Sequence, residues 1–477
     1  MLEISRPDRP RSYTVQRMAE DQLSLLWYSG VCASSQLRTR DGRRVRLLYR
    51  GLPNGDRGPD YLGAVVSLGR GRPRSGDIEL HLRTSQWRAH GHHLDARYNG
   101  VVLHVVWKDD NPGPTVLSSG RQVPVLALAG VSPVQRPPAF PEEPCRQEPG
   151  PDLSRLCRVL DRAGLDRFWG KSARLEGDMS ILPAGEVLYQ SLAESLGYSH
   201  NKASFRRLAV SLPLAVLEGY LWGQDPSRRE AMAEALLIGA AGLLPTQRGL
   251  DPGPGWPSLL EALWEGSGRE RYLAPADWSL GVRPDNHPVR RLAGLACMVV
   301  ASLEEGLANW VMGMWRGGYR CQEAGANPDH TTPSTLSPEP LALYPGPGWR
   351  RAMPWERQVR GYWRDHFDFG RPGARLSAVL IGPGRALEVA ANVLLPFAHA
   401  LGQTVGDEEL SRAAEDAFCR LPAPCSNQVT RHMAGQLMAH PDARALATAR
   451  RHQGLLHLFH SYCTRGRCGA CPMGRTL

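Results

Sequence analysis

Lysine is almost missing from this chain of 477 residues: three of its 57 basic residues are lysines, and the other 54 are arginines. The chain also has no stretch of about 18 uncharged apolar residues, which argues against a membrane-spanning helix. Its first residues, MLEISRPDRPRSY, lack the apolar segment of a secretory signal. Neither a P-loop nor a Gly-x-Ser-x-Gly nucleophile motif occurs. We therefore expect a cytoplasmic protein that has no membrane segment and neither of these two catalytic motifs.

Basic residues outnumber acidic ones, 57 to 47, which gives a formal net charge of +10. A positive chain favours phosphate-bearing partners, because phosphates that arginine neutralises release their counterions. The preference for arginine over lysine is explained more simply by the base composition of the coding DNA. The charge therefore predicts nucleic acid as the partner, without distinguishing DNA from RNA.

Residues 1–130 have the pattern of an α+β (or α/β) domain. Residues 15–29 space their apolar side chains like one face of a helix. Strand patterns, alternating or continuously apolar, follow at residues 44–50, 62–68, 77–83 and 101–107. A polar, His-rich segment between the last two strands would form a short helix or a long loop. We expect a mixed sheet with flanking helices in this domain.

Residues 131–151 are dense in proline and predict a linker. Beyond the linker the pattern becomes helical, for example over residues 205–221 and 229–244. A second Pro- and Gly-rich stretch marks a possible break at residues 322–349. The sequence therefore predicts a mostly α-helical domain over residues 152–477.

The strand at residues 77–83 carries ionisable side chains on one face only. Side chains alternate across a strand, so that face holds Asp77, Glu79, His81 and Arg83. The opposite face holds Ile78, Leu80 and Leu82, which can enter a core. The ionisable face is either a solvated outer surface or the wall of a site.

A further carboxylate lies at the start of the preceding strand, in Gly58-Pro59-Asp60. Two carboxylates at the ends of neighbouring strands, Asp60 and Glu79, can jointly hold Mg²⁺ or Mn²⁺ with water and substrate phosphate. Such an ion orients or ionises a water molecule and neutralises charge on the phosphate in the transition state. The pattern therefore predicts a metal-dependent site.

Pro59-Asp60 and Glu79-Leu80-His81 resemble the motif of the PD-(D/E)XK nuclease superfamily. That superfamily places Pro-Asp on one strand and Glu-x-Lys on the next, between flanking helices, and the element order over residues 15–110 is similar. The resemblance implies a nuclease-like fold in which Asp60 and Glu79 bind Mg²⁺ or Mn²⁺. It implies an assisting role for Glu20 on the preceding helix. To these residues our hypothesis adds Asp77 as a further metal ligand, His81 acting on the water and Arg83 on the phosphate.

His81 departs from the motif, because the superfamily has lysine at this position. Lysine would stabilise charge or orient the attacking water. A neutral imidazole could instead accept a proton from that water, while Arg83 supplied the positive charge on the phosphate. The alternative is a degenerate site that binds nucleic acid without cutting it.

Five histidines fall within 24 residues, namely His81, His90, His92, His93 and His104. The stretch from His90 to Asp95 is similar to the His-x-His-x-Asp-His signature of metallo-β-lactamase-like hydrolases, but Asp95 comes one position late and no histidine follows it. The cluster fits a zinc site, a polar loop near a phosphate or metal site, or a surface loop of hydrogen-bonded histidines.

Three cysteines near the end of the chain, Cys463, Cys468 and Cys471, have the spacing C-x4-C-x2-C. A C-x2-C pair on a tight turn suits one tetrahedral metal centre, so zinc or an iron–sulfur cluster is expected here. A fourth ligand would come from His457, His460, Cys419 or Cys425. The alternative is a reduced cluster without metal.

Longer stretches resemble the bacterial "domain of unknown function 2851" family over nearly the full length of the chain. They are residues 58–68, 76–110, 283–293 and 462–474. The resemblance implies a bacterial, cytoplasmic protein in which the first region and the cysteine tail act as one functional unit. It implies no particular activity.

These observations lead to the hypothesis of a metal-dependent nuclease that hydrolyses phosphodiester bonds of DNA or RNA. Three alternatives stay open. The chain binds nucleic acid without catalysis, it is a zinc-dependent hydrolase of small molecules, or it is a purely structural partner protein.

Overall fold

The computed structural model describes residues 20–29, 37–54, 58–129, 152–198, 200–312, 361–373, 376, 380–438 and 443–473. Their contacts divide the chain into two compact units. The sheet unit comprises the residues up to Val159 with Asn427–Pro441 and Leu455–Leu477, and the helical unit comprises Leu160–Ser426 and Asp442–Gly454. The expected linker at 131–151 and break at 322–349 lie outside the described residues.

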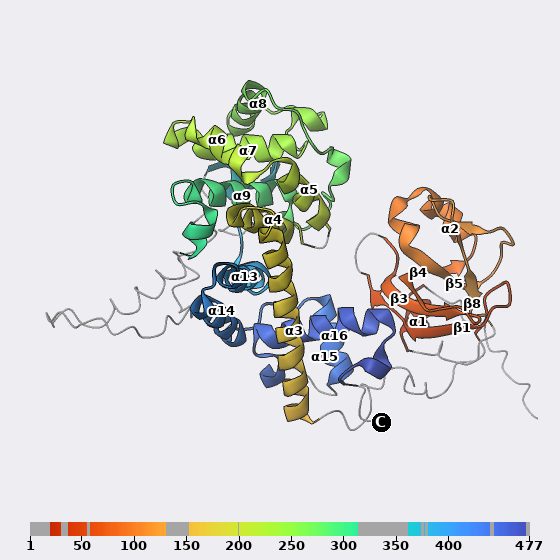
Figure 1. Cartoon of the computed structure of the whole chain (residues 1–477). Helices are drawn as coiled ribbons and strands as arrows, with labels where there is room; N and C mark the ends of the chain where they lie inside the picture. The colour runs from red at the N-terminus through yellow and green to blue at the C-terminus, as the bar shows by residue number, and fades with distance from the viewer. Residues whose placement is uncertain are drawn as a thin grey trace, which may run out of the picture. The chain divides into compact units, whose positions relative to one another are not determined.

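A mixed sheet is the centre of the sheet unit (Figure 1). Its described strands are β1 (Val45–Tyr49), β2 (Leu52–Pro53), β3 (Tyr61–Leu68), β4 (Arg74–Arg83), β5 (Val101–Lys108) and β8 (Val125–Ala127). The strand order is β1-β3-β4-β5-β8, and β2 also pairs with β3. The pairs β1–β3 and β3–β4 are antiparallel, whereas β4–β5 and β5–β8 are parallel. The expected mixed sheet with flanking helices is confirmed.

One face of the sheet is covered by α1 (Glu20–Ser29), which lies within the helix expected at residues 15–29. Leu23 and Trp27 of this helix share a buried core with Ile78 and Leu80 of β4. Burying each such side chain stabilises the fold by about 1.5–3 kcal/mol. The alternation of apolar and ionisable side chains expected along β4 is therefore confirmed for its apolar residues, which face the core.

The segment between β4 and β5 lies against the other face. It contains the short helix α2 (Gln86–Ala89) and two 3₁₀ turns, His92–Leu94 and Ala96–Gly100. Its side chains Trp87 and Tyr98 form a second small core with a hairpin of β6 (Thr115–Val116) and β7 (Gln122–Val123). Because this segment covers β4, the ionisable face of the strand is buried at Glu79 and His81 rather than solvated.

The C-terminal segments pack on the same sheet. The Tyr49 hydroxyl of β1 lies 3.3 Å from Nε2 of His432 in α15 (Gln428–Leu437). The Tyr49 ring also contacts Phe459 of α16 (Ala449–Ser461), with ring centroids 5.7 Å apart. Gly466 has a φ of +62° and lies against Val65 of β3. These contacts group the cysteine tail with the sheet, although its position in the sequence placed it in the expected domain over 152–477.

The helical unit confirms the change to helical structure. Its longer described helices are α3 (Leu153–Met179), α4 (Ala184–Leu196), α5 (Lys202–Ser211), α6 (Leu214–Trp222), α7 (Arg229–Ala240), α8 (Trp256–Gly266), α9 (Pro288–Ser302), α13 (Leu395–Val405) and α14 (Glu408–Arg420). The first residues of α3 are counted with the sheet unit. The single helix expected over 205–221 is wrong: it is two helices, because Pro213 has no N–H to continue the first. No described helix combines the length and apolarity that crossing a membrane requires.

Helix α7 is buried along most of its length and carries one acidic side chain inside the unit. The Glu234 carboxylate accepts hydrogen bonds from the indole N–H groups of Trp256 at 2.9 Å and Trp363 at 2.8 Å. Burial raises the pKa of Glu234 to about 8, although both hydrogen bonds act in the opposite direction. The folded state therefore holds a proton on Glu234 at a pH where the unfolded chain has released it.

Raising the pH should destabilise the helical unit through Glu234. A folded pKa above the unfolded pKa means that stability is fully present below the unfolded value of about 4.5 and is lost as the pH rises toward 8. Glu234→Gln removes this titration and keeps an oxygen that accepts from the indoles. We expect the variant to melt several degrees above the wild type at pH 9, at about 2–4 °C per kcal/mol, with a smaller difference at pH 5. Thermal unfolding that is equally pH-dependent in both proteins would contradict this assignment.

Candidate functional site

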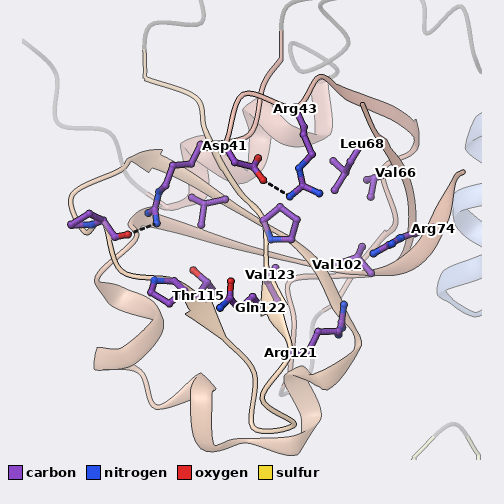
Figure 2. Close-up of a pocket in the computed structure, with 15 residues that line it drawn as sticks. Asp41, Arg43, Val66, Leu68, Arg74, Val102, Thr115, Arg121, Gln122 and Val123 are labelled. Atoms are coloured by element: carbon purple, nitrogen blue, oxygen red, sulfur yellow. Dashed lines mark hydrogen bonds and ion pairs between the residues drawn. The ribbon is translucent and has the colours of Figure 1, made fainter. Parts of the chain in front are cut away.

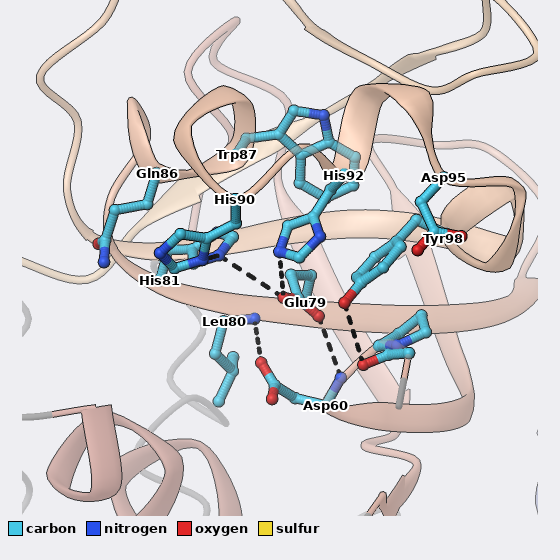
Figure 3. A network of polar contacts seen from close by, with 12 residues as sticks. Asp60, Glu79, Leu80, His81, Gln86, Trp87, His90, His92, Asp95 and Tyr98 are labelled. Carbon is cyan, nitrogen blue, oxygen red and sulfur yellow. Dashed lines mark hydrogen bonds and ion pairs between the residues drawn. The ribbon is translucent and has the colours of Figure 1, made fainter. Parts of the chain in front are cut away.

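Asp60 and Glu79 hold each other in place through the main chain (Figure 3). The backbone N–H of Asp60 donates to Oε2 of Glu79 at 3.1 Å, and the N–H of Leu80 donates to Oδ2 of Asp60 at 2.8 Å. The register between β3 and β4 shifts beside this point, between Tyr61 and Ala64. The structure therefore brings together the two carboxylates that the sequence singled out.

The two carboxylates are electrostatically crowded. Glu79 is only 5% exposed. Burial and the negative charge of Glu79 raise the pKa of Asp60 to about 7. Burial also raises the pKa of Glu79, although its contact with His92 opposes the shift. The charge of Glu20 raises both pKa values further. A divalent cation at this place would relieve the repulsion.

A row of histidines, of which His81 and His104 are buried and His90 is exposed, begins beside Glu79. Nδ1 of His81 lies 2.9 Å from Nε2 of His104, and Nδ1 of His104 lies 3.1 Å from the hydroxyl of Thr115. On its other side, Nε2 of His81 lies 3.1 Å from Nδ1 of His90. The parallel pairing of β4 with β5 places His104 next to Glu79 and thereby fixes this row. Burial lowers the pKa of His81 to about 2 and that of His104 to about 3, so both imidazoles are neutral.

His92 contacts Glu79 from the segment between β4 and β5, here called the covering segment. Its Nε2 lies 3.2 Å from Oε1 of Glu79, and Nε2 of His81 lies 3.6 Å from the same oxygen. The His92 ring stacks on Tyr98 at a centroid distance of 3.9 Å. The Tyr98 hydroxyl in turn donates to the carbonyl of Gly58 at 3.3 Å. The covering segment is therefore tied to the strand end that carries Asp60.

Other expected site residues have different positions. The Asp77 carboxylate accepts from the N–H of Gly63 at 3.0 Å and lies against Gly100, so it braces two tight backbone positions. Glu20 is exposed on α1 and accepts from the Gln86 amide at 3.1 Å. Arg83 is exposed at the end of β4, where its N–H donates to Gln86 at 2.8 Å.

The cysteine tail lies apart from these contacts. Cys463 and Cys471 are buried and Cys468 is half-buried. Sγ of Cys463 lies 4.0 Å from Sδ of Met433 in α15. Across the described ranges, the one group of three or more His, Cys, Asp or Glu with ligand atoms all within 4.8 Å is His81, His90 and His92. The expected zinc or iron–sulfur centre at the cysteines stays a prediction.

A separate cavity of about 510 Å³ lies in the same unit and is lined by four arginines (Figure 2). Two of them are paired with carboxylates, Arg40 with Asp109 and Arg43 with Asp41. Arg121 donates instead to two backbone carbonyls. Arg74 has no carboxylate partner within the described part of the chain. The cavity therefore carries net positive charge.

Sequence reasoning did not single out Tyr98 or Thr115, and it counted His104 in the histidine cluster without assigning it a position. His104 gave the clearest signal, because it is the single polar residue in the apolar strand VVLHVVW. A fully buried histidine there needs hydrogen-bond partners, which His81 and Thr115 provide.

Comparison with known families identifies the chain. Residues 20–313 match the model of the family described as "Protein of unknown function (DUF2851)". The chain belongs to this family. The match covers more than half of the chain, including the whole β1-to-β8 sheet and the histidine row, and confirms the family resemblance seen in the sequence. Comparison with curated proteins and with solved structures found no match.

The bracing role of Asp77 can be tested at Gly100. A Cβ at this position would overlap the Asp77 carboxylate. We expect Gly100→Ala to lower the free energy of unfolding of the sheet unit by about 1–3 kcal/mol. Gly435→Ala is the control, because this glycine is exposed in α15 with nothing near its Cβ position and alanine favours a helix. Equal unfolding midpoints in urea for Gly100→Ala and the wild type would show that Asp77 does not brace this turn.

Proposed function

We propose that the sheet unit hydrolyses phosphodiester bonds of nucleic acid with a divalent metal ion. The observation that carries the proposal is the pair of backbone hydrogen bonds from Asp60 to Glu79 and from Leu80 to Asp60. They hold the buried carboxylate of Glu79 and the half-buried carboxylate of Asp60 close together, without a neighbouring lysine or arginine among their described contacts. Such a pair provides oxygen ligands for a divalent cation, and the cation would neutralise the excess negative charge of the two carboxylates.

The order of elements supports the proposal. Helix α1 is followed by the antiparallel strands β1, β3 and β4, by the short helix α2 and by β5 parallel to β4. This is the sequence of helix, strands, helix and strand that the resemblance to PD-(D/E)XK nucleases implies. Asp60 lies immediately before β3 and Glu79 lies on β4, which is close to the motif's placement of the two carboxylates on successive strands.

His81 replaces the lysine of the motif with a neutral imidazole. Because burial keeps His81 neutral, it offers a lone pair and no positive charge. Charge neutralisation on the phosphate would then fall to the metal ion and to arginine. The exposed Arg83 and the arginine-lined cavity supply candidates for contacts with a nucleic-acid backbone.

Two alternatives fit some of the same features. A degenerate site would bind nucleic acid through arginine without cleaving it. A zinc-dependent hydrolase of small molecules is favoured by the histidines that meet at Glu79.

A cleavage assay separates these functions. We expect the full chain to cut labelled DNA or RNA with Mg²⁺ or Mn²⁺ and to stop when a chelator is added. Asp60→Asn and Glu79→Gln keep the shape of each side chain and remove its charge, so each should lower the cleavage rate by on the order of 100-fold or more.

Asp152→Asn is the matched control, because it removes an exposed carboxylate in the same unit. Cleavage that survives in the Asp60→Asn, Glu79→Gln double variant would place the activity elsewhere. Salt-sensitive binding by the wild type without any product would instead support the degenerate site.

The cavity provides a test of binding alone. Arg74→Ala removes a cationic side chain that lines it, and we expect weaker binding to single- or double-stranded nucleic acid with a salt dependence reduced by about one counterion. Arg412→Ala, which removes an exposed arginine from α14 in the helical unit, is the control. Identical affinities and salt slopes for both variants would exclude the cavity as a phosphate contact.

A further inference from the structure

We propose that His81, His90 and His92, together with Glu79, bind a transition-metal ion of the zinc class. The proposal goes beyond the cleavage reaction above and does not depend on it. It adds an ion held by nitrogen ligands, whereas the expected site at Asp60 and Glu79 uses oxygen ligands for Mg²⁺ or Mn²⁺.

The distances fit one ion. The ligand atoms of the three histidines all lie within 4.8 Å of one another, and Nε2 of His81 is 3.1 Å from Nδ1 of His90. Two nitrogens bound tetrahedrally to one zinc ion at about 2.0–2.1 Å are separated by about 3.3 Å. Oε1 of Glu79 lies 3.2 Å from Nε2 of His92 and 3.6 Å from Nε2 of His81. Three imidazoles and one carboxylate thus converge.

His92 brings to the site a buried ring nitrogen whose contact with Glu79 is poorly aligned. Its Nε2 is buried and makes no hydrogen bond of acceptable geometry to any described residue, although it lies within ion-pair distance of Glu79. The whole residue is only 8% exposed. A poorly aligned contact satisfies a buried ring nitrogen only in part, and a metal ion at its lone pair would satisfy it fully.

The hydrogen bonds behind His81 are compatible with the tautomer that metal binding requires. If Nε2 of His81 faces an ion, its Nδ1 carries the proton and donates to Nε2 of His104 at 2.9 Å. Nδ1 of His104 then carries a proton and donates to the Thr115 hydroxyl at 3.1 Å. Histidines that bind metals usually donate their second N–H in this way, which fixes the ring.

The local backbone explains how His90 and His92 reach the same point. Gly91 between them has a φ of +76° and the left-handed conformation. Glycine adopts this conformation without strain, and the turn directs both flanking imidazoles toward His81. Tyr98 and Trp87 pack around the His92 ring and restrict its movement.

The chemistry of these ligands defines the ion. Imidazole suits Zn²⁺, Co²⁺, Ni²⁺ and Fe²⁺, whereas Mg²⁺ and Ca²⁺ prefer oxygen ligands. The two oxygens of Glu79 serve different neighbours, since Oε1 faces the histidines and Oε2 accepts from the Asp60 N–H. Glu79 is therefore shared between the histidine site and the carboxylate pair.

Titration with the metal alone tests the proposal. The full chain, stripped of metal, is titrated with Zn²⁺ in a calorimeter and with Co²⁺ in an absorption spectrometer. The protein carries Cys463→Ser, Cys468→Ser and Cys471→Ser, so that the C-terminal cysteine cluster contributes no thiolate. We expect one tight site with the Co²⁺ spectrum of nitrogen and oxygen ligands and no sulfur charge-transfer band. His90→Ala should weaken binding by at least about 100-fold, which exceeds most effects of outer-shell changes.

His90 is the residue of choice because it is exposed, so its removal should leave the fold intact. His93→Ala is the control from the same turn and should bind metal like its parent. Equal Zn²⁺ affinity in His90→Ala and His93→Ala, with both melting like the parent, would overturn the site. Tight Zn²⁺ binding that appears only when the cysteines are present would also overturn it. Cleavage of nucleic acid is measured separately, so a chain that binds Zn²⁺ at His90 but cuts nothing refutes the nuclease and upholds the metal site.

Discussion

The burial of the Glu79 carboxylate is the constraint on which the candidate site depends. A carboxylate removed from water must be hydrogen-bonded or paired, because desolvation alone costs several kcal/mol. Oε2 of Glu79 receives the Asp60 N–H, and Oε1 lies beside His92. Each of these partners is held in turn, Asp60 by the Leu80 N–H and His92 by its stacking on Tyr98. The covering segment and the two strands are therefore coupled through one side chain.

The sequence was sufficient to predict which side chains of β4 face the core and which face the site, because this depends only on the alternation of residues along the strand. Alternation along 77–83 places Ile78 and Leu80 in the core and Glu79 and His81 on the opposite face. The pairing of Asp60 with Glu79 also follows from order along the chain, because antiparallel neighbours joined by a short turn bring their outer ends together. These inferences needed only the geometry of one hairpin.

The histidine row could not be predicted, because it depends on contacts across a long connection. Seventeen residues separate Arg83 from Val101, and the parallel register that places His104 beside Glu79 is fixed only when this segment folds over the sheet. For Arg83 the alternation pattern is misleading. The pattern places Arg83 on the same face as Glu79, but the segment between β4 and β5 does not cover this end of the strand, and Arg83 is exposed to solvent. The packing of the cysteine tail on β3 joins residues 400 positions apart and has no signal in local pattern.

Charge balance is the physical argument for the cation that we propose in this site. With lysine at position 81, a positive charge within the protein would offset the carboxylates. With histidine, burial keeps the imidazole neutral, and His104 behind it is neutral as well. The nearest charge from α1, that of Glu20, adds to the repulsion. Backbone N–H groups and His92 offset part of the repulsion, but the pKa of Asp60 is still raised to about 7, so the site holds a proton near neutral pH. In the proposed site a divalent ion would compete with that proton near neutral pH, so histidine at the position where the motif has lysine would make the site more dependent on metal.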